Sequence, residues 1–215
     1  FRGKELQGVF EEIASHENAV SIKPQAIEKI PLAFPGSVRE LLESANSKEA
    51  TKTMEELIIS HLSERKLSQL SGGELQKVAI AFCALKDAKT YFIDEPSSYL
   101  DIRERLRMAG FLRGKLNDGN AFMVVEHDLI LLDYLSDNIH LIYGEPAVVG
   151  VVSATRPTRE GINTYLEGYS KEENYRFRAS PITFMEKSAR DARKQIPLLQ
   201  WPDFSVAQGS FRLHA

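Results

Sequence analysis

The chain has 215 residues, of which 43% are hydrophobic and 27% charged, and its formal net charge is -3. These values are ordinary for a soluble globular protein that buries a substantial core; they exclude a wholly basic nucleic-acid binder and leave room for local basic patches. A single cysteine, Cys83, excludes a disulfide framework and a multi-cysteine metal site, and we expect it to pack in the core. No apolar run reaches the roughly 18 residues of a membrane span. The chain opens on Phe1 without a signal peptide, so we expect a cytoplasmic protein that is part of a longer product.

The first half of the chain alternates helical and strand patterns. In chain order, the periodicities predict a helix over 3–14, a strand over 19–25, helices over 37–44, 51–61 and 73–87, and a strand over 90–94. Pro24 stops the first strand, and Pro96 breaks the chain after the second. The first half therefore supplies strands separated by a helical region at about 35–87.

The second half continues the alternation. It predicts a helix over 101–116, a strand over 121–126, a helix over 129–137 capped by Asp128, and strands over 138–144 and 147–153 around a Gly-Glu-Pro turn. The apolar run over 121–126 is typical of a strand buried on both faces of a parallel sheet. We expect Leu131, Leu132 and Leu135 in the core. Strands alternating with helices predict an α/β domain with a largely parallel sheet.

The character of the sequence changes from Thr155 onward. We expect the α/β domain over 1–154, a polar hinge or linker over 155–200 with one short helical stretch, and the first hairpin of another domain over 201–215. Basic residues gather in and after the hinge, where they could touch RNA phosphates; solvation or inter-domain ion pairing is an equally good interpretation. These residues are Arg156, Arg159, Arg176, Arg178, Arg190, Arg193 and Lys194.

Asp94 and Glu95 end the apolar strand over 90–94, at the carboxyl edge where open α/β sheets bind ligands. The first acid can hold Mg2+, and the second can orient and deprotonate an attacking water. The simpler alternative is a strand that ends in a turn-forming acid pair. His127 follows the strand over 121–126; if the two strands are neighbours, its imidazole lies near the acids and could donate to a terminal phosphate, whereas otherwise it is a capped or packed residue.

The sequence LSGGE precedes the strong helix over 73–87. Ser71 is a natural N-cap, and Gly72 and Gly73 let backbone amides approach a ligand, so this helix start is typical of an anion site. An ordinary capped helix with a flexible entry is the alternative. The strand and acid pair that follow at this distance make the combination specific.

ABC-type ATPases carry a signature motif, a Walker B strand, a D-loop and a switch histidine, and the chain resembles them in LSGGE, YFIDEP, SSYLD and VVEHD. More narrowly, it resembles the ABCE or RNase L inhibitor family, soluble ATPases that split ribosomal subunits. The stretches that carry this resemblance are LSGGELQK, DEPSSYLD, VVEHDLILLDYLSD, IYGEPAVVGVVS, REGINTYLEGY and ENYRFR. The last two match that family's hinge. The resemblance covers nearly the whole chain and implies an ABC-type P-loop ATPase domain with a helical subdomain, incomplete at its N-terminus.

The resemblance also implies roles for individual residues. Asp94 and Gln25 would hold Mg2+, Glu95 would be the general base, and His127 the switch histidine. The signature residues Ser71, Gly72, Gly73 and Glu74 would bind ATP held by a second nucleotide-binding domain, and the D-loop acid Asp101 would lie at that interface. Gln25 depends mostly on the resemblance, since a single Gln after a Pro is usually loop. The implied partners are that second domain, the small ribosomal subunit, release or initiation factors and ribosomal RNA, without a membrane.

Some parts expected of such an ATPase are missing from the sequence. No G-x-x-x-x-G-K-[ST] loop occurs, and near misses at Gly3-Lys4 and over 110–116 lack its spacing and hydroxyl. One cysteine cannot ligate iron–sulfur clusters, which we expect only in an N-terminal domain outside this chain. Lys77 stands where the family usually has arginine. We therefore expect the isolated chain to bind ATP weakly without hydrolysing it.

Two other interpretations stay open. The chain could be a truncated, catalytically inactive module that binds ribosomes or another partner. It could also belong to another soluble ABC ATPase, such as a translation-factor or DNA-repair member, although the hinge block argues against this.

Overall fold

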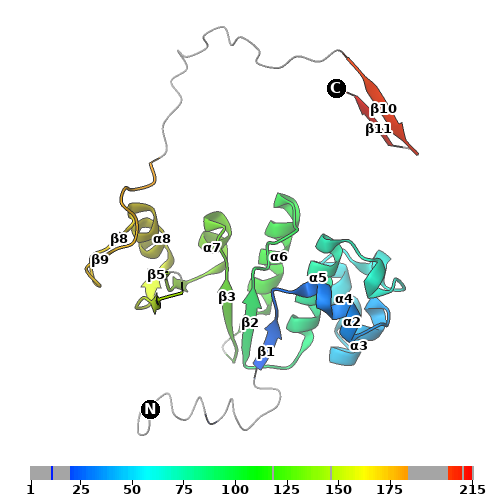
Figure 1. The fold of residues 1–215 in the computed structure, drawn as a ribbon. Coiled ribbons are helices and arrows are strands. Elements are labelled where there is room, and N and C mark those ends of the chain that lie inside the picture. The colour runs from blue at the N-terminus through cyan, green and yellow to red at the C-terminus, as the bar shows by residue number, and fades with distance from the viewer. Residues whose placement is uncertain are drawn as a thin grey trace.

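The computed structural model describes residues 11, 20–117, 119–145, 147–183, 203–209 and 211–214. Its centre is a parallel sheet of three strands in the order β1 (Val20–Lys23), β2 (Thr90–Asp94) and β3 (Ala121–Val125) (Figure 1). The register sets Ile22 opposite Phe92, and Phe92 opposite Met123. The α/β class and the parallel sheet predicted from the sequence are confirmed.

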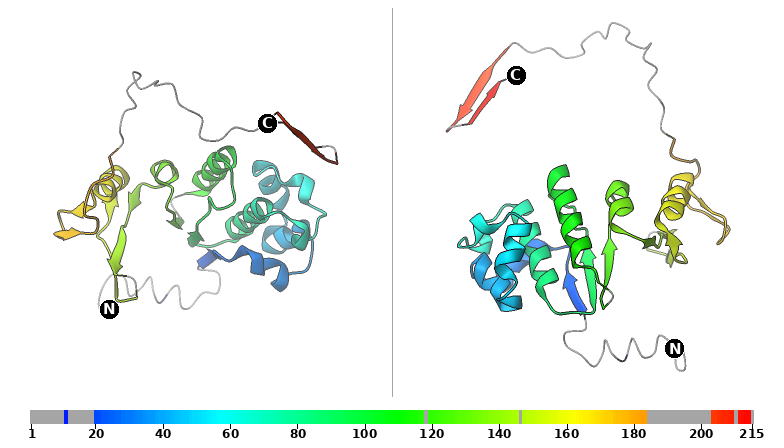
Figure 2. Two further views of the ribbon diagram at one scale, coloured as in Figure 1. Left: turned by 45° about the horizontal axis from the view of Figure 1, so that its top comes forward. Right: turned by 180° about the vertical axis from the view of Figure 1, so that it is seen from behind.

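A helical region connects β1 to β2. It contains η1 (Ile27–Lys29), α2 (Ile30–Ala33), α3 (Val38–Asn46), α4 (Ala50–Glu56), η2 (Ser60–Leu62), η3 (Leu67–Gln69) and α5 (Gly72–Leu85). The helix predicted over 51–61 is wrong in its second half, because α4 ends at Glu56 and Ile58 takes a left-handed φ of 53°. This reversal buries Leu57 and Ile59 in the core that α3 and α5 share. Figure 2 shows the helical region on one side of the sheet and α8 (Thr158–Glu167) on the other.

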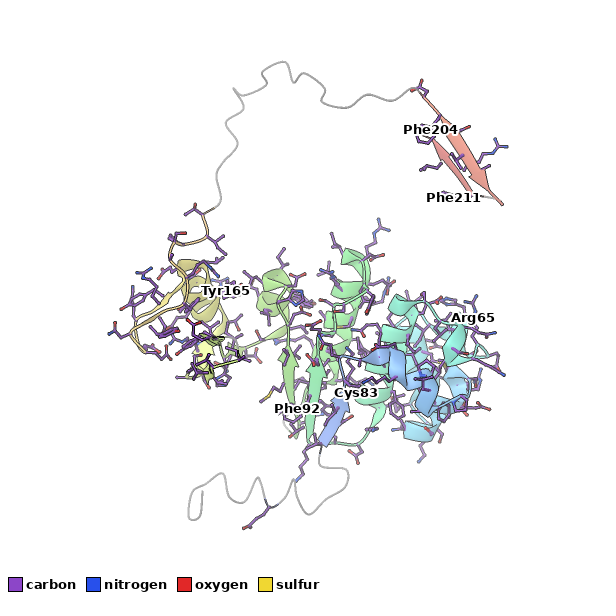
Figure 3. All side chains as sticks on the ribbon, viewed as in Figure 1. Arg65, Cys83, Phe92, Tyr165, Phe204 and Phe211 are labelled. Carbon is purple, nitrogen blue, oxygen red and sulfur yellow. The ribbon has the colours of Figure 1, made fainter. Side chains whose placement is uncertain are left out.

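The long helix α5 packs against β1 and β2 and covers one face of the sheet. Tyr91 is buried on this face and stacks on Phe122 with ring centroids 4.5 Å apart. Cys83, labelled in Figure 3, is 1% exposed, and its carbonyl oxygen accepts a hydrogen bond of 2.9 Å from the Ser21 hydroxyl, so its predicted place in the core is confirmed.

The opposite face of the sheet is open. Ile22, Met123 and Val125 are 61%, 53% and 50% exposed on it. The prediction that the strand over 121–126 is buried on both faces is therefore wrong for the described residues. The sequence pattern indicates that a strand is apolar, whereas its burial depends on which elements cover it. In the described part of the chain, helices cover only one face of this sheet.

Two helices follow the second and third strands. They are α6 (Ile102–Lys115) and α7 (Leu129–Leu135), which pack on each other beside the sheet. Leu131 is 3% exposed, and Leu135 packs against the same core. The short strand β4 (Asn138–Ile139) pairs with β7 (Arg156–Pro157). A hairpin of β5 (Ile142–Glu145) and β6 (Val149–Val152) lies between them in sequence.

The region predicted as a hinge contains regular structure, comprising β7 (Arg156–Pro157), α8 (Thr158–Glu167), β8 (Tyr169–Ser170) and β9 (Tyr175–Arg176). Its centre is Arg156, which is 3% exposed. The Arg156 guanidinium donates to Ser170 Oγ at 2.7 Å, lies 3.1 Å from Glu172, and pairs with Glu173. Hydrogen bonds from Ser170 and Arg156 lower the pKa of Glu173 to about 2. A buried arginine paired with two carboxylates nearer the surface therefore holds this segment together.

The hairpin predicted at the C-terminal end is confirmed as antiparallel β10 (Ser205–Gln208) and β11 (Phe211–His214). Apart from Glu11, the helix predicted over 3–14 lies outside the described residues, as do the near-miss loop at Gly3-Lys4 and the basic residues Arg190, Arg193 and Lys194. Among the residues that are described, no helix is long and apolar enough to cross a membrane.

Candidate functional site

The site begins where β2 and β3 end side by side. Asp94 is the last residue of β2 and lies opposite Val125, and the Glu95 amide donates to the Val125 carbonyl oxygen at 2.9 Å. Glu95 has a left-handed φ of 44°, which is uncommon for a residue with a Cβ. The parallel register therefore brings Glu95 and the residues after β3 to one edge of the sheet.

The Glu95 carboxylate has polar neighbours from two other segments. The Gln25 side chain hydrogen-bonds to it, and Ser98 Oγ donates to it at 3.1 Å. These two hydrogen bonds, Gln25 first, hold the pKa of Glu95 below its usual value, and the nearby His127 also lowers it. Glu95 is therefore ionised at neutral pH and able to accept a proton from a water molecule.

The loop after β3 carries a buried acid beside an exposed histidine. The Glu126 side chain is 0% exposed, whereas the His127 side chain is 76% exposed. Glu126 accepts hydrogen bonds from the backbone amides of Ser97 at 3.3 Å, His127 at 2.8 Å and Asp128 at 3.1 Å. This carboxylate ties the turn after β2 to the turn after β3, and it leaves the His127 ring at the surface near Glu95.

Two further side chains lie beneath the turn after β2. Lys23 Nζ donates to the carbonyl oxygens of Asp94 at 2.5 Å and Glu95 at 3.4 Å, and Gln76 Nε2 donates to the Glu95 carbonyl oxygen at 2.7 Å. Lys23 is 1% exposed and Gln76 0%. Burial lowers the pKa of the Lys23 ammonium, while the charges of Asp94 and Glu95 oppose this effect.

The signature turn, Ser71–Glu74, starts α5 at the surface. Ser71 and Glu74 form a capping box, in which the Ser71 amide and hydroxyl each donate to Glu74 Oε2 at 2.8 Å. The Ser71 hydrogen bonds, that from the backbone amide first, lower the pKa of Glu74. A Cβ at Gly73 would lie 2.8 Å from the Tyr99 carbonyl oxygen, so the glycine permits a close approach between this turn and the following loop.

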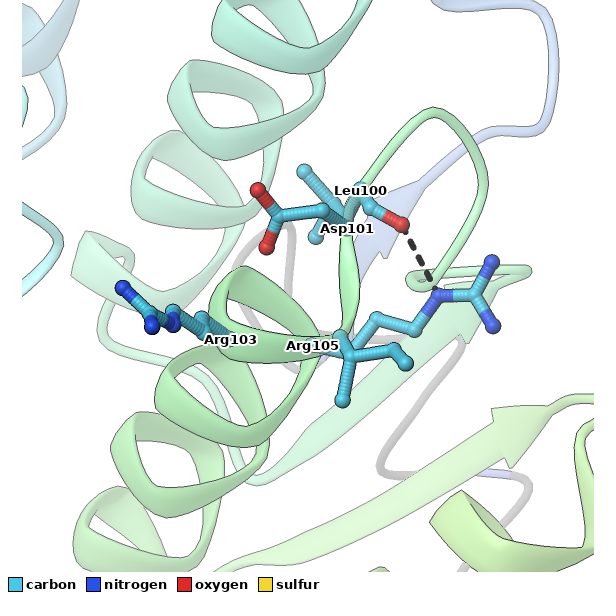
Figure 4. A pocket seen from close by; sticks show the side chains of 5 residues that line it. Leu100, Asp101, Arg103 and Arg105 are labelled. Atoms are coloured by element: carbon cyan, nitrogen blue, oxygen red, sulfur yellow. Dashed lines mark hydrogen bonds between the residues drawn. The ribbon is translucent and has the colours of Figure 1, made fainter.

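That following loop, Ser97–Asp101, is the D-loop of the predicted ATPase. Asp101 caps α6 by accepting from the Glu104 amide at 2.9 Å. Arg105 Nε donates to the Leu100 carbonyl oxygen at 2.9 Å, as Figure 4 shows, and its Nη1 donates to Asp128 at 2.8 Å. A pocket of about 550 Å³ opens here, lined by Leu100, Asp101, Ile102, Arg103 and Arg105. The D-loop is thus joined to the loop that carries His127.

The structure separates the predicted site residues into two groups. Gln25, Asp94, Glu95 and His127 come together at the carboxyl edge of the sheet. The glycines of the signature turn lie against Tyr99, two residues before Asp101, and within the described part of the chain no hydrogen bond joins this turn or Asp101 to the Glu95 carboxylate. Lys77, in place of the expected arginine, lies 3.2 Å from Glu104 of α6, so its charge joins two helices.

Sequence reasoning missed four residues that organise this edge, namely Lys23, Gln76, Ser98 and Glu126. Gln76 had a readable signal, because its amide side chain stands on an otherwise apolar face of α5. Lys23 had none, because it is the last residue of β1 and shares its face of the strand with Ser21. Ser98 and Glu126 had none, since polar residues in turns are common.

The donor set at this edge suits Mg2+. Asp94 offers carboxylate oxygens and Gln25 an amide oxygen, which are the hard ligands that Mg2+ takes alongside nucleotide phosphates and water. Within the described ranges, no group of three or more His, Cys, Asp or Glu side chains could enclose a metal ion alone. The edge therefore fits a metal ion that arrives with a phosphate ligand.

Comparisons with known proteins agree with this geometry. A family model described as "ABC transporter" matches residues 1–98. Protein Pixie of Drosophila melanogaster is 42% identical over 99% of this chain and 35% of its own length. Translation initiation factor rli1 of Schizosaccharomyces pombe is 40% identical over 99% of this chain and 37% of its own length.

Solved structures extend the likeness to three dimensions. An archaeal ribosome recycling factor, in complex with an archaeal ribosomal stalk protein, matches 100% of this chain and 42% of its own with a TM-score of 0.87 and 46% identity. The chain belongs to the ABCE family of ABC ATPases. Membership implies ATP and Mg2+ binding. This ABCE chain spans 35% and 37% of the two curated relatives named above.

Proposed function

We propose that the chain is part of an ATPase that couples ATP binding and hydrolysis to the splitting of ribosomal subunits. The observation that carries the proposal is the edge at which Gln25 hydrogen-bonds to the Glu95 carboxylate beside His127. An ionised carboxylate held in this way can take a proton from water attacking a terminal phosphate. ATP and Mg2+ would supply the phosphoryl group and its charge neutralisation.

Each residue at the edge has a role in this proposal. Asp94 and Gln25 hold Mg2+, and Gln25 also orients Glu95 through their hydrogen bond. Glu95 is the general base for the attacking water. The exposed ring of His127 donates to the terminal phosphate.

The signature turn serves a different nucleotide. Gly72 is exposed and Gly73 half-buried, and the N-terminus of the 14-residue α5 offers backbone amides to an anion. In the proposal, Ser71–Glu74 bind ATP held by a second nucleotide-binding domain, with Asp101 at the interface. The chain thus contributes to two composite sites.

The proposal of ribosomal partners is based on related proteins. One is a ribosome recycling factor solved with a ribosomal stalk protein, and another, 47% identical, is in a structure described as ribosome-bound archaeal Pelota and ABCE1. We propose the small ribosomal subunit and translation factors as partners in the cytoplasm. Arg176 and Arg178 lie over the rings of Tyr169 and Tyr165, which offers a basic aromatic surface to ribosomal RNA.

Sucrose-gradient sedimentation tests the proposal. Ribosomes incubated with the native protein and ATP should convert to separate subunits over repeated turnovers, and the Glu95→Gln variant should lose this turnover. The ATPase rate at this site should fall by about 10²-fold or more in Glu95→Gln. We call the ATPase rate of the native protein, or of a variant of it, minus the rate of Glu95→Gln the Glu95-dependent hydrolysis. Ribosomes that sediment unchanged with active protein and ATP would refute the splitting function.

A catalytically inactive binding module is the second candidate. The observation that favours it is the absence of G-x-x-x-x-G-K-[ST] from the 215 residues. It predicts co-sedimentation with ribosomes that does not depend on ATP. Binding that strengthens with ATP would exclude it.

A further inference from the structure

Two buried side chains converge on one carbonyl oxygen beneath the proposed general base. Gln76 Nε2 donates to Glu95 O at 2.7 Å, and Lys23 Nζ lies 3.4 Å from the same oxygen and 2.5 Å from Asp94 O. Gln76 comes from α5 and Lys23 from β1. The backbone at Glu95 is thus held by two elements far apart in the sequence.

Burying these groups is costly. Lys23 is 1% exposed and Gln76 is 0% exposed, although charged and amide groups lose hydration when they leave water. Gln76 Oε1 has no hydrogen-bond partner among the described residues, so the amide is only half satisfied. An apolar side chain of similar volume would avoid the cost, and the hydrogen bond to Glu95 O is what these residues gain in return.

The carbonyl they hold belongs to a strained residue. Glu95 has a φ of 44°, and a residue with a Cβ is strained in the left-handed region. Such a conformation persists when its surroundings fix it. The orientation of the Glu95 side chain, which Gln25 and Ser98 also contact, follows from this backbone geometry.

Resting on the proposed function, we propose that Gln76 and Lys23 are positioning residues for ATP hydrolysis. They hold Glu95 in its left-handed conformation so that its carboxylate faces the attacking water. Neither touches substrate. Gln76 additionally makes the signature helix a direct support of the general base.

Because Gln76 lies in α5, a movement of the first turn of this helix would also affect the hydrogen bond that holds Glu95. Gln76 lies three residues after Gly73, about 4.5 Å along the helix axis, so a displacement of the signature turn moves the donor that holds Glu95 O. A misplacement of about 1 Å at a reacting group can cost about 10²-fold in rate. Engagement of the signature turn by a partner's nucleotide is thereby linked to the alignment of Glu95.

Steady-state kinetics of the native protein test this role. Gln76→Met and Lys23→Met remove the donors while keeping unbranched side chains of similar length. The Glu95-dependent kcat should fall about 10- to 100-fold in each, with KM for ATP within about twofold of wild type. Gln76→Asn keeps an amide but withdraws it by one methylene, and it should likewise lower the Glu95-dependent kcat while leaving KM for ATP nearly unchanged.

Thr53→Val is the matched control. Thr53 is 0% exposed in α4, and its Oγ1 has no partner in the described part of the chain, so this variant also replaces a buried polar group. It should keep the wild-type kcat. The inference is overturned if Gln76→Met, Gln76→Asn and Lys23→Met keep kcat within twofold, or if their losses disappear once the rate is corrected for the folded fraction. A native protein whose hydrolysis does not respond to Glu95→Gln would instead overturn the proposed function.

Discussion

Replacing Glu126 by alanine should loosen the link between the turns that follow β2 and β3. Its fully buried carboxylate accepts from the backbone amides of Ser97, His127 and Asp128 at 3.3, 2.8 and 3.1 Å. Each hydrogen bond to a charged group contributes about 1.5–3 kcal/mol. Because the His127 side chain is exposed, water can replace some of these three hydrogen bonds. We therefore expect Glu126→Ala to lower the local opening free energy by about 2–5 kcal/mol.

Glu126→Gln should cost less. The amide oxygen can still accept from His127 and Asp128, as Oε1 does, whereas the NH2 group would face the Ser97 amide, donor against donor. We expect a loss of about 1–2 kcal/mol, confined to the Ser97 side. The two substitutions therefore predict different patterns at the two turns.

Hydrogen exchange of the native protein, followed by mass spectrometry on peptides that contain Ser97 or residues 127–128, measures both patterns. Since about 1.4 kcal/mol is a factor of ten, Glu126→Ala should speed exchange at both turns by about 30-fold or more. Glu43→Ala is the control, because Glu43 is an exposed residue of α3 whose ion pair with Arg39 is 3.6 Å long. Unchanged exchange in Glu126→Ala, or equal effects of alanine and glutamine at both turns, would refute the reasoning.

Three further predictions follow from the same contacts. Gln25→Ala should raise the pKa of Glu95, so the acid limb of the Glu95-dependent ATPase profile should move to higher pH. The pKa of Glu173 is about 2 when folded against an ordinary 4.5, so its stabilisation is complete above 4.5 and lost as the pH falls toward about 2. Acid titration by circular dichroism should show this loss, and Arg156→Met should reduce it, because the Ser170 hydrogen bond, the largest cause, remains. Gly73→Ala should destabilise by about 1–3 kcal/mol in thermal unfolding, since its Cβ would lie 2.8 Å from a D-loop carbonyl oxygen. A wild-type acid limb in Gln25→Ala would contradict the first expectation, and a wild-type acid titration in Arg156→Met the second. A wild-type melting temperature in Gly73→Ala would contradict the third.

The sequence predicted the elements that carry the edge of the sheet. The strand over 90–94 matches β2 residue for residue, and the strand over 121–126 is β3 with one residue fewer. These two strands could be predicted because each is a short apolar run bounded by turn residues, which can be read from the local sequence. The expectation that Glu95 and His127 share an edge followed from the parallel pairing of these strands, which the structure has.

The sequence could not show what covers the sheet or what supports the site. Exposure of Met123 and Val125 depends on the elements packed against β3, which lie elsewhere in the chain. The hydrogen bond from Gln76 to Glu95 O spans 19 residues, and that from Lys23 to Asp94 O spans 71. Such contacts arise only once the tertiary fold is formed. An amide on an apolar helix face shows that Gln76 needs a hydrogen-bond partner, but the partner itself cannot be read from the local sequence.

The central claim is that Glu95 is the general base for ATP held by this domain. A single-turnover experiment with radiolabelled ATP, in which the native protein is quenched over time and its nucleotides are separated, tests this most directly. We expect Glu95→Gln to retain one ATP per protein molecule unhydrolysed, while the wild type converts it to ADP. Conversion of all bound ATP at the wild-type rate in Glu95→Gln would contradict the claim.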